Sequence, residues 1–195
     1  MSQSDAVTGS SDGPMAPLGG TAAAIEPILD PVDVDLVDIQ ILRLLADDSR
    51  ASQRQLAREV GMSAPAVGER IARLERLGVI RGYSVAVDWA RLDYSMEVYL
   101  NILAVSGVNM GQLISDLNAL PEVESVNSIS GSFDLQARLR VRDHRHLNRL
   151  LVHGIWQLSA IQRTETQLSF ASAPHWDFTS NLLSHIQEQQ KNHSK

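Results

Sequence analysis

Residues 52–82 read SQRQLAREVGMSAPAVGERIARLERLGVIRG and decide the fold of the first half of the chain. Their pattern predicts two short helices joined by a tight turn and followed by a strand. Leu56, Ala57 and Val60 place an apolar stripe on the first helix. Gly61 follows where that helix would end, because glycine readily adopts the left-handed backbone that terminates a helix.

The second predicted helix begins near Ser63, an N-cap candidate, and Pro65 lies in its first turn, where a missing N–H costs little. Helical spacing relates the residues of its buried stripe, which are Val67, Ile71, Leu74 and Gly78. A second stripe on the same helix consists of Ala66, Glu69, Arg70 and Arg73. This arrangement is typical of a helix–turn–helix, whose second helix packs on its own domain and offers another face to the DNA major groove.

The helix–turn–helix predicts binding to double-stranded DNA, with arginines making bidentate contacts to phosphates and guanine edges. The alternative interpretation is an ordinary helical hairpin whose polar face is only solvated. The residues that we predict to contact DNA are Gln53, Arg54, Ser63, Ala64, Pro65, Ala66, Glu69, Arg70 and Arg73.

The distribution of charge agrees with DNA binding once the chain is divided. The whole protein carries a formal charge of −6. Residues 1–35 contain six acidic residues and neither Lys nor Arg, whereas residues 50–82 contain seven Arg and three Glu. A local basic patch of this kind is the electrostatic footprint of a duplex-binding module.

The composition restricts the remaining possibilities. The 195 residues, 44% of them hydrophobic, suffice for one large domain or two small ones with real cores. The absence of cysteine excludes a disulfide framework, a thiolate metal site and a cysteine nucleophile, and it favours a reducing cytoplasm. No motif in the sequence predicts a secretory signal, a membrane span or a cofactor.

The first 88 residues divide into a flexible acidic tail over residues 1–30 and a DNA-binding domain over residues 31–88. The tail is rich in Ser, Gly, Ala and Pro, and it buries too little apolar surface to order itself. Asp33 or Asp35 caps a first helix, which supplies the third wall of the helical core through Val37, Ile41, Leu44 and Leu45. Residues 77–88 alternate as an apolar strand that resembles the wing and linker of a winged helix–turn–helix.

We predict a second domain over residues 95–172, because from Met96 onward segments with apolar residues at every second position alternate with segments of helical spacing. The predicted strands cover Met96–Ile102, Val123–Ile129, Phe133–Val141 and Ile161–Phe170. Apolar residues at helical spacing predict one helix after the first strand and another after the third. The order predicts an α+β domain of the ferredoxin-like βαββαβ type, with a four-stranded antiparallel sheet and two helices on one face.

The other face of this sheet is polar. Arg138 and Arg140 alternate with core residues, so we expect their face to meet water, a ligand or another copy of the chain. Residues 173–195 form a C-terminal tail, in which an amphipathic piece contains Leu182, Leu183 and Ile186. We expect this piece to pack against a partner subunit.

Motifs in both domains resemble the Lrp/AsnC (feast/famine) transcriptional regulators over about residues 33–172. The first domain carries Asp35-x-x-Asp38-x-x-Ile41-Leu42 and Arg70-Ile71-x-Arg73-Leu74-Glu75-x-x-Gly78-Val79-Ile80-x-Gly82-Tyr83. The second domain carries Gly131-Ser132-Phe133-Asp134-Leu135, Val141-Arg142-Asp143 and Thr164-Glu165-Thr166. The chain departs from the family pattern before the last strand, where it reads Leu158-Ser159-Ala160-Ile161 without the usual proline and glycine.

The resemblance implies a sequence-specific regulator that binds DNA as a homodimer, commonly assembled further into octamers. It also implies that an amino acid or similar metabolite binds between subunits and alters DNA binding. The implied effector residues are Gly131, Ser132, Phe133, Asp134, Thr164 and Thr166. A glycine turn would present N–H groups to a carboxylate, and Asp134 would neutralise an ammonium; alternatively, Gly131 and Asp134 only shape a tight hairpin turn.

Two further functions stay open at this point, although we expect no enzymatic activity. A few relatives with this layout are haem-pathway (siroheme-type) decarboxylases, which need His and Arg side chains converging on a carboxylate-rich substrate. His144 and His146 flank Arg145, but we expect surface loop histidines, and no third residue completes a metal site. The other possibility is a small-molecule-binding module with a vestigial DNA-binding half, which Arg70 and Arg73 argue against.

Overall fold

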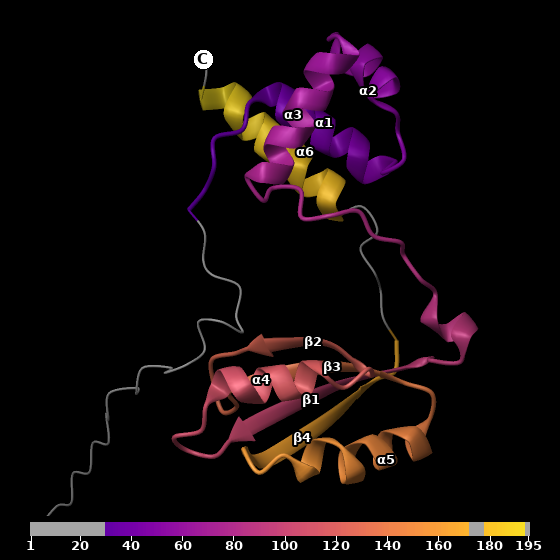
Figure 1. Cartoon of the computed structure of the whole chain (residues 1–195), viewed down its shortest axis with the longest axis vertical. Helices are drawn as coiled ribbons and strands as arrows, with labels where there is room; N and C mark the ends of the chain where they lie inside the picture. Colours follow the sequence, from indigo (N-terminus) through magenta and orange to yellow (C-terminus); the bar gives the residue numbers. More distant parts are fainter. Residues whose placement is uncertain (1–29, 172–177, 194–195) are drawn as a thin grey trace, which may run out of the picture. The chain divides into compact units, whose positions relative to one another are not determined.

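The computed structural model describes residues 30–171 and 178–193, and Figure 1 shows the order of its elements. The chain divides into two compact units. Trp89–Phe170 form one unit, and the described residues on either side of that range form the other. The expected N-terminal tail falls in residues 1–29, with the exception of Asp30, and therefore lies outside the described residues.

The first two helices begin at reciprocal side-chain caps. α1 (Leu36–Asp47) follows Asp35, whose carboxylate accepts the N–H of Asp38, and the Asp38 carboxylate accepts the N–H of Asp35. α2 (Gln53–Val60) has the same arrangement between Ser52 and Gln55. Each capping box satisfies N–H groups that have no partner within the helix.

The turn between α2 and α3 has the chemistry that the sequence predicted. Gly61 ends α2 with φ +68°, in the left-handed region that favours glycine. Ser63 then caps α3 (Ala64–Arg76) by accepting the N–H of Ala66, and Pro65 lies in the first turn. The predicted helix–turn–helix is confirmed.

The three helices enclose a small apolar core. Its buried residues are Ile41 of α1, Leu56 and Ala57 of α2, and Val67 of α3. Partly buried residues packed around them include Val37, Leu44, Leu45, Val60 and Ile71. The predicted third wall is thus confirmed, because α1 closes the core that the helix pair alone would leave open.

A fourth helix, α6 (Phe178–His193), packs on α1 of its own chain. Three side-chain hydrogen bonds run along this contact: Arg43 Nη1 to Gln187 Oε1 (2.9 Å), Ser180 Oγ to Asp47 Oδ1 (2.7 Å) and Gln190 Nε2 to the Val34 carbonyl (3.0 Å). We expected this segment to pack against a partner subunit. The structure instead makes it part of the helix–turn–helix unit.

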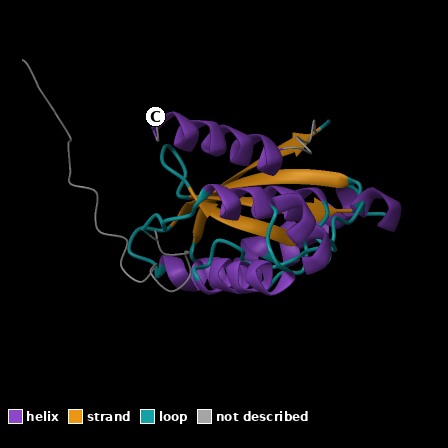
Figure 2. Cartoon of the chain, turned by 90° about the horizontal axis from the view of Figure 1, so that it is seen from above, coloured by secondary structure: helices purple, strands orange, loops and turns teal. Residues whose placement is uncertain are grey.

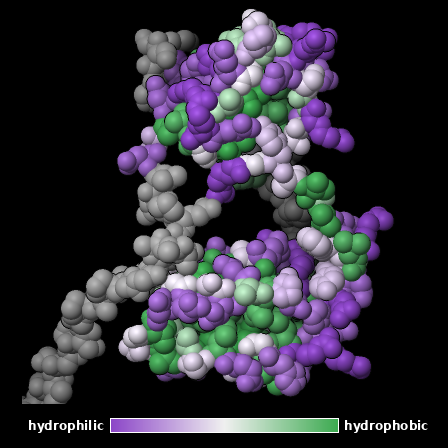
Figure 3. All heavy atoms as spheres, in the orientation of Figure 1, coloured by the Kyte–Doolittle hydropathy of each residue, from purple (hydrophilic) through white to green (hydrophobic). Residues whose placement is uncertain are grey.

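The strand expected over residues 77–88 does not form. Turn residues follow α3, and residues 81–88 have no sheet partner within the described part of the chain. A strand requires a neighbour that satisfies its N–H and C=O groups, and a single chain supplies none here. The apolar residues of the alternating pattern, Tyr83, Val85 and Val87, are instead exposed by 53%, 85% and 41%. Hydrophobic residues of this connecting segment are visible at the surface in Figure 3.

The second unit is the predicted four-stranded antiparallel sheet. Its strands are β1 (Met96–Ala104), β2 (Val123–Ser128), β3 (Leu135–Val141) and β4 (Ile161–Ser169), in the order β2-β3-β1-β4. The helices are α4 (Met110–Asn118) and α5 (His144–His153), with a 3-10 turn over Ile155–Gln157. Figure 2 shows the helices and strands of the whole chain from a second direction.

One face of this sheet and the two helices form the larger core. The completely buried strand residues include Val98, Leu100 and Ile102 of β1 and Leu135, Ala137 and Leu139 of β3. Leu113, Leu117 and Leu150 cover them from the helices. The ferredoxin-like fold is confirmed. α5 ends at His153, and a 3-10 turn over Ile155–Gln157 carries the apolar pattern onward.

The open face of the sheet carries an ion-pair network centred on Glu97 of β1. Glu97 Oε2 lies 3.2 Å from Arg138 Nη2 and 2.8 Å from Arg140 Nη2, and Tyr99 donates to Oε1 at 2.6 Å. Burial alone would raise the pKa of Glu97, but the hydrogen bonds from Tyr99 and Arg138 and the charges of both arginines hold it below its ordinary value. The two predicted surface arginines are therefore tied to the sheet.

Glu97→Gln tests this network. A carboxyl whose pKa is lower in the folded state stabilises the fold above its unfolded pKa, and that contribution is lost as the pH falls through the folded pKa. We expect Glu97→Gln to lower the free energy of unfolding at pH 7 by roughly 1–3 kcal/mol and to flatten the loss of stability toward acid pH. Urea titrations over a pH series measure both effects. Glu165→Gln, on the exposed part of β4, is the control, and equal pH profiles for the two variants would contradict the assignment.

Candidate functional site

The predicted DNA-contacting residues occupy two surfaces of the helix–turn–helix unit. Gln53 and Arg54 are exposed on α2, and Ser63, Pro65 and Glu69 are exposed along the start of α3. Ala64 and Ala66 are half-buried between them. These seven residues form a surface that a duplex could approach.

Arg70 and Arg73 point toward the start of α1 instead. Arg70 Nη1 lies 2.7 Å from both Asp35 Oδ2 and Asp38 Oδ1. Arg73 Nη1 lies 3.0 Å from Asp38 Oδ2, and its Nη2 donates to the Asp33 carbonyl at 2.8 Å. The structure therefore does not leave the predicted basic stripe free, because both guanidinium groups already have acidic partners.

The Asp38 carboxylate requires both of these arginines. Its exposed fraction is 1%, and an unpaired charge at that depth would be strongly unfavourable. Hydrogen bonds from Arg70 to Asp38 and Asp35 in turn raise the pKa of Arg70, so it is charged at every relevant pH. The pairing fixes α3 against α1, and Arg70 and Arg73 act first as positioning residues of the recognition helix.

Gly68 brings α2 and α3 into close contact. A Cβ at this position would lie 2.9 Å from Oε1 of Gln53, at the start of α2. The predicted DNA-contacting residue Gln53 thus packs over α3 through the space that glycine leaves. This contact helps to set the angle between the two helices.

Three arginines of this unit are exposed and have no acidic partner within residues 30–171 and 178–193. Arg54 and Arg58 lie one turn apart on the outer face of α2, and Arg76 ends α3. We did not predict Arg58 and Arg76 as DNA contacts. The basic composition of residues 50–82 includes both arginines. The sequence does not tell which arginines stay free, because that depends on which helix face meets the acidic residues of α1.

The glycine–aromatic–aspartate turn lies between β2 and β3. Gly131 has φ +130°, where glycine is favoured, and the Asp134 carboxylate accepts the Ala104 N–H at 2.8 Å. The Asp134 backbone also pairs with Ile129 and with Ile102. Asp134 therefore secures the end of β1 whatever else it binds, as the turn interpretation requires.

The remaining implied effector residues lie on two sides of the sheet. Thr164 pairs with Ile102 and Thr166 with Leu100, so both threonines share the helix-covered face, at its edge. The Thr164 hydroxyl accepts the indole N–H of Trp156 at 3.0 Å. By contrast, the Phe133 ring lies 4.9 Å from the guanidinium carbon of Arg163, which follows the opposite alternation. One chain does not bring all six residues around a single cavity.

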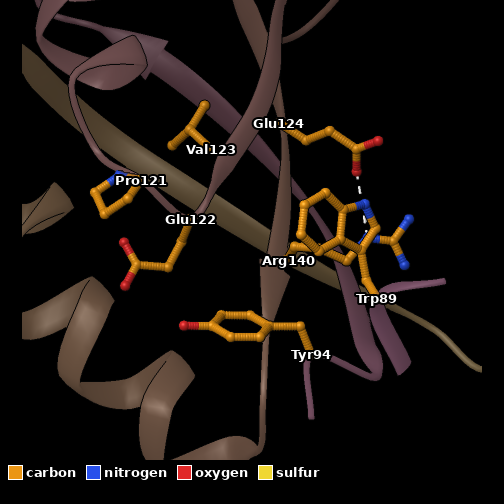
Figure 4. Close-up of a pocket in the computed structure, with 7 residues that line it drawn as sticks. All are labelled: Trp89, Tyr94, Pro121, Glu122, Val123, Glu124 and Arg140. Atoms are coloured by element: carbon orange, nitrogen blue, oxygen red, sulfur yellow. Dashed lines mark hydrogen bonds and ion pairs between the residues drawn. The ribbon is translucent and has the colours of Figure 1, made fainter. Parts of the chain in front are cut away.

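A cavity of about 450 Å³ in this unit was missed by the sequence analysis. Figure 4 shows Trp89 and Tyr94 facing Glu122, Glu124 and Arg140 across it, with the Tyr94 hydroxyl directed to the side on which Glu122 lies. Glu124 Oε2 is 3.3 Å from Arg140 Nε. The two aromatic residues after the connecting segment were the available signal, but only the fold brings them to the start of β2.

His146 corrects the expectation of surface histidines. His144 is exposed, whereas His146 is 6% exposed and its Nε2 lies 2.9 Å from Glu122 Oε1. The Arg142 N–H donates to Nδ1 of His146, which leaves Nε2 as the proton donor to Glu122. The Asp143 carboxylate caps α5 by accepting the backbone N–H of His146 at 2.7 Å. This cap fixes the first turn of α5, in which the His146 side chain points inward.

Family models match both units. Residues 34–81 match a model described as winged helix-turn-helix DNA-binding, and residues 97–173 match the Lrp/AsnC ligand binding domain. The leucine-responsive regulatory protein of Klebsiella pneumoniae is 33% identical over 136 residues, which cover 69% of this chain and 83% of that protein. The chain belongs to the Lrp/AsnC family.

Further relatives agree with this assignment. An uncharacterized HTH-type transcriptional regulator of Pyrococcus abyssi is 29% identical over 147 residues, covering 75% of this chain and 92% of the relative. The solved structure of Escherichia coli AsnC has the same fold, with a TM-score of 0.70 at 23% identity over 73% of this chain and 96% of that one. This Lrp/AsnC protein is thus a transcriptional regulator with a DNA-binding unit and a ligand-binding unit.

The comparisons do not support the decarboxylase alternative. The relatives named above are regulators, and the second family model describes a ligand-binding domain. Among the described residues, no three His, Asp or Glu side chains are placed to hold a metal. None of the helices in the described ranges is long and apolar enough to cross a membrane.

Asp38→Ala tests the positioning role of the α1–α3 ion pairs. Removing the Asp38 carboxylate leaves Arg70 and Arg73 charged but without this acidic partner, so we expect a loss of roughly 3 kcal/mol in the free energy of unfolding. Thermal and urea unfolding of the full chain measure it. Glu59→Ala, at an exposed acidic residue of α2, should change stability by less than about 0.5 kcal/mol. Similar effects of the two substitutions would show that Asp38 does not hold α3.

Proposed function

We propose that this regulator binds double-stranded DNA through α2 and α3 as a homodimer, and that an amino acid or related metabolite in the ligand-binding unit changes this binding. The observation that carries the proposal is the union in one chain of a capped helix–turn–helix with free surface arginines and a family ligand-binding domain. We infer a cytoplasmic location from this proposed binding to DNA.

The DNA contacts divide into two roles. The start of α3, from Ser63 to Glu69, enters the major groove, where its exposed side chains reach base edges. Arg54, Arg58 and Arg76 contact phosphates, since they are exposed and unpaired in the described chain. Arg70 and Arg73 keep the helix in this orientation through Asp38.

Two surfaces that the described residues leave uncovered support the homodimer. Residues 82–87 offer a row of backbone groups that have no hydrogen-bond partner within the described residues, with apolar side chains alternating along them. The open face of the sheet, centred on Glu97, Arg138 and Arg140, is a second surface. A second copy of the chain can cover both, and four such dimers would build the octamer.

The chemistry of the ligand-binding unit suits an amino acid. The Gly131 turn has N–H groups for a carboxylate, and Asp134 has an ionisable carboxyl for an ammonium. Since Gly131–Asp134 and Thr164 do not share one cavity in a single chain, a partner subunit would complete the site. One solved structure of this fold, from Neisseria meningitidis, is a complex with L-methionine, at 17% identity over 73% of this chain and 94% of that one, with a TM-score of 0.69.

The combined substitution Arg54→Ala and Arg58→Ala tests the DNA surface. Each lost phosphate contact should lower the slope of log affinity against log salt by about 0.9, so two contacts lower it by roughly 1.8. Fluorescence anisotropy with the protein's own promoter duplex, over a series of salt concentrations, measures the slope. Arg145→Ala and Arg149→Ala, on the exposed face of α5, form the control. An unchanged slope in the α2 variant would remove this surface from the proposal.

Asp134→Asn tests the effector site with little damage to the fold. Asparagine keeps an oxygen that accepts the Ala104 N–H but removes the charge that would bind an ammonium. We expect L-leucine and L-methionine to raise the melting temperature of the wild type and to lose at least about tenfold in affinity on Asp134→Asn, a tenfold loss being about 1.4 kcal/mol. DNA affinity without amino acid should stay unchanged.

The parallel variant Trp89→Ala distinguishes the two regions of the ligand-binding unit. It enlarges the cavity of Figure 4 without touching the Gly131 turn. Loss of amino-acid binding in Trp89→Ala but not in Asp134→Asn would move the effector site to that cavity.

A further inference from the structure

The C-terminal helix α6 is an addition to the part of the chain that the family models cover. The ligand-binding match ends at residue 173, and α6 begins at Phe178. Nevertheless α6 belongs to the helix–turn–helix unit and not to the unit that it follows in sequence. The chain therefore leaves the DNA-binding unit after α3 and returns to it after β4.

The contact between α6 and α1 extends along α1. Ser180 Oγ donates to Asp47 Oδ1 at the end of α1, and Gln190 Nε2 donates to the Val34 carbonyl just before its start. Between them, Arg43 Nη1 donates to Gln187. The face of α6 toward α1 is half-buried and comprises Leu183, Ser184, Ile186, Gln187 and Gln190. The helix thus packs through an apolar stripe with polar bonds at both ends.

Both connections to the ligand-binding unit start at the same place in the DNA-binding unit. A cavity of about 840 Å³ is bordered by Leu42 and Leu45 of α1, by the segment 79–84 after α3, and by Thr179 and Ser180 of α6. Displacement of either connection therefore acts on the same end of α1. Because Asp38 of α1 pairs with Arg70 and Arg73, a displacement of α1 also acts on α3, which carries these two arginines.

The C-terminal connection is the shorter of the two. Eight residues, 170–177, join β4 to α6, and nineteen residues, 77–95, join α3 to β1. The C-terminal connection starts from β4, the strand of Thr164 and Thr166.

We propose that α6 is a brace through which β4 and the recognition helix are coupled: docked on α1, it ties the effector strand to the helix that positions α3. The coupling rests on the proposed function, because it links the effector region to DNA binding. The docking of α6 on α1 does not rest on it. Lengthening or removing the C-terminal connection then uncouples the units, while the longer connection through residues 77–95 stays intact.

Disulfide trapping in the full chain tests the docking. The protein contains no cysteine, so Asp47→Cys with Ser180→Cys introduces the only two thiols, at side chains that contact each other. Mild oxidation should give a nearly complete bond within one chain, seen on non-reducing gels and by mass spectrometry. Glu59→Cys with Ser180→Cys is the control and should give less than about a tenth as much. A bond between two chains, or none, would overturn the docking of α6 on its own α1.

Hydrogen exchange tests the coupling. Addition of the promoter duplex should slow amide exchange in β4 of the wild type by at least about threefold, because binding sites that are coupled must influence each other reciprocally. A flexible twelve-residue Gly/Ser insertion after Ala171 should abolish this change while leaving duplex affinity within about twofold. A wild type without the change, or an insertion variant that keeps it, would overturn the coupling. If no variant binds the duplex, the proposed function fails, and the trapping result still decides whether α6 docks.

Discussion

The buried carboxylate of Asp38 is the constraint on which the DNA-binding unit depends. It lies at the start of α1, with 1% of its surface exposed, and it binds one arginine from each of two successive turns of α3. Because a charge at that depth is stable only when it is paired, the two helices have little freedom to rotate against each other. α3 is thereby held in one orientation, and in the proposed function the exposed arginines elsewhere on the unit attract the phosphates.

The helix that carries Asp38 also lies beside the segments that lead to the ligand-binding unit. α1 receives the ion pairs of α3 at one end, and at the other it shares a cavity with the segment after α3 and with the start of α6. The chain enters the ligand-binding unit at Trp89 and leaves it through β4, so the two ends of that unit lead to α3 and to α6. A regulator needs such a link, because a ligand acts only by favouring one arrangement of the DNA-binding helices over another.

Most of the fold was predictable because local chemistry and long-range packing agree. Gly61, Ser63 and Pro65 marked the helix–turn–helix, and strict alternation marked β1 and β3. The failures have physical causes. The alternating residues after α3 have no strand to pair with in the described part of one chain. The amphipathic C-terminal segment packs on α1 of its own chain.

The candidate site was less predictable than the fold. Arg70 and Arg73 looked like DNA contacts, because a sequence shows charge but not the acidic residues that approach from another element. His146 and the cavity at Trp89 were hidden for the same reason, since both depend on β2 lying beside residues that are distant in sequence. A hydroxyl-radical footprint on the protein's own promoter tests the central claim most directly. The account predicts two protected half-sites about 10.5 base pairs apart, or a multiple of that, as two α3 helices of a dimer require. Protection of a single half-site, or no protection, would contradict it.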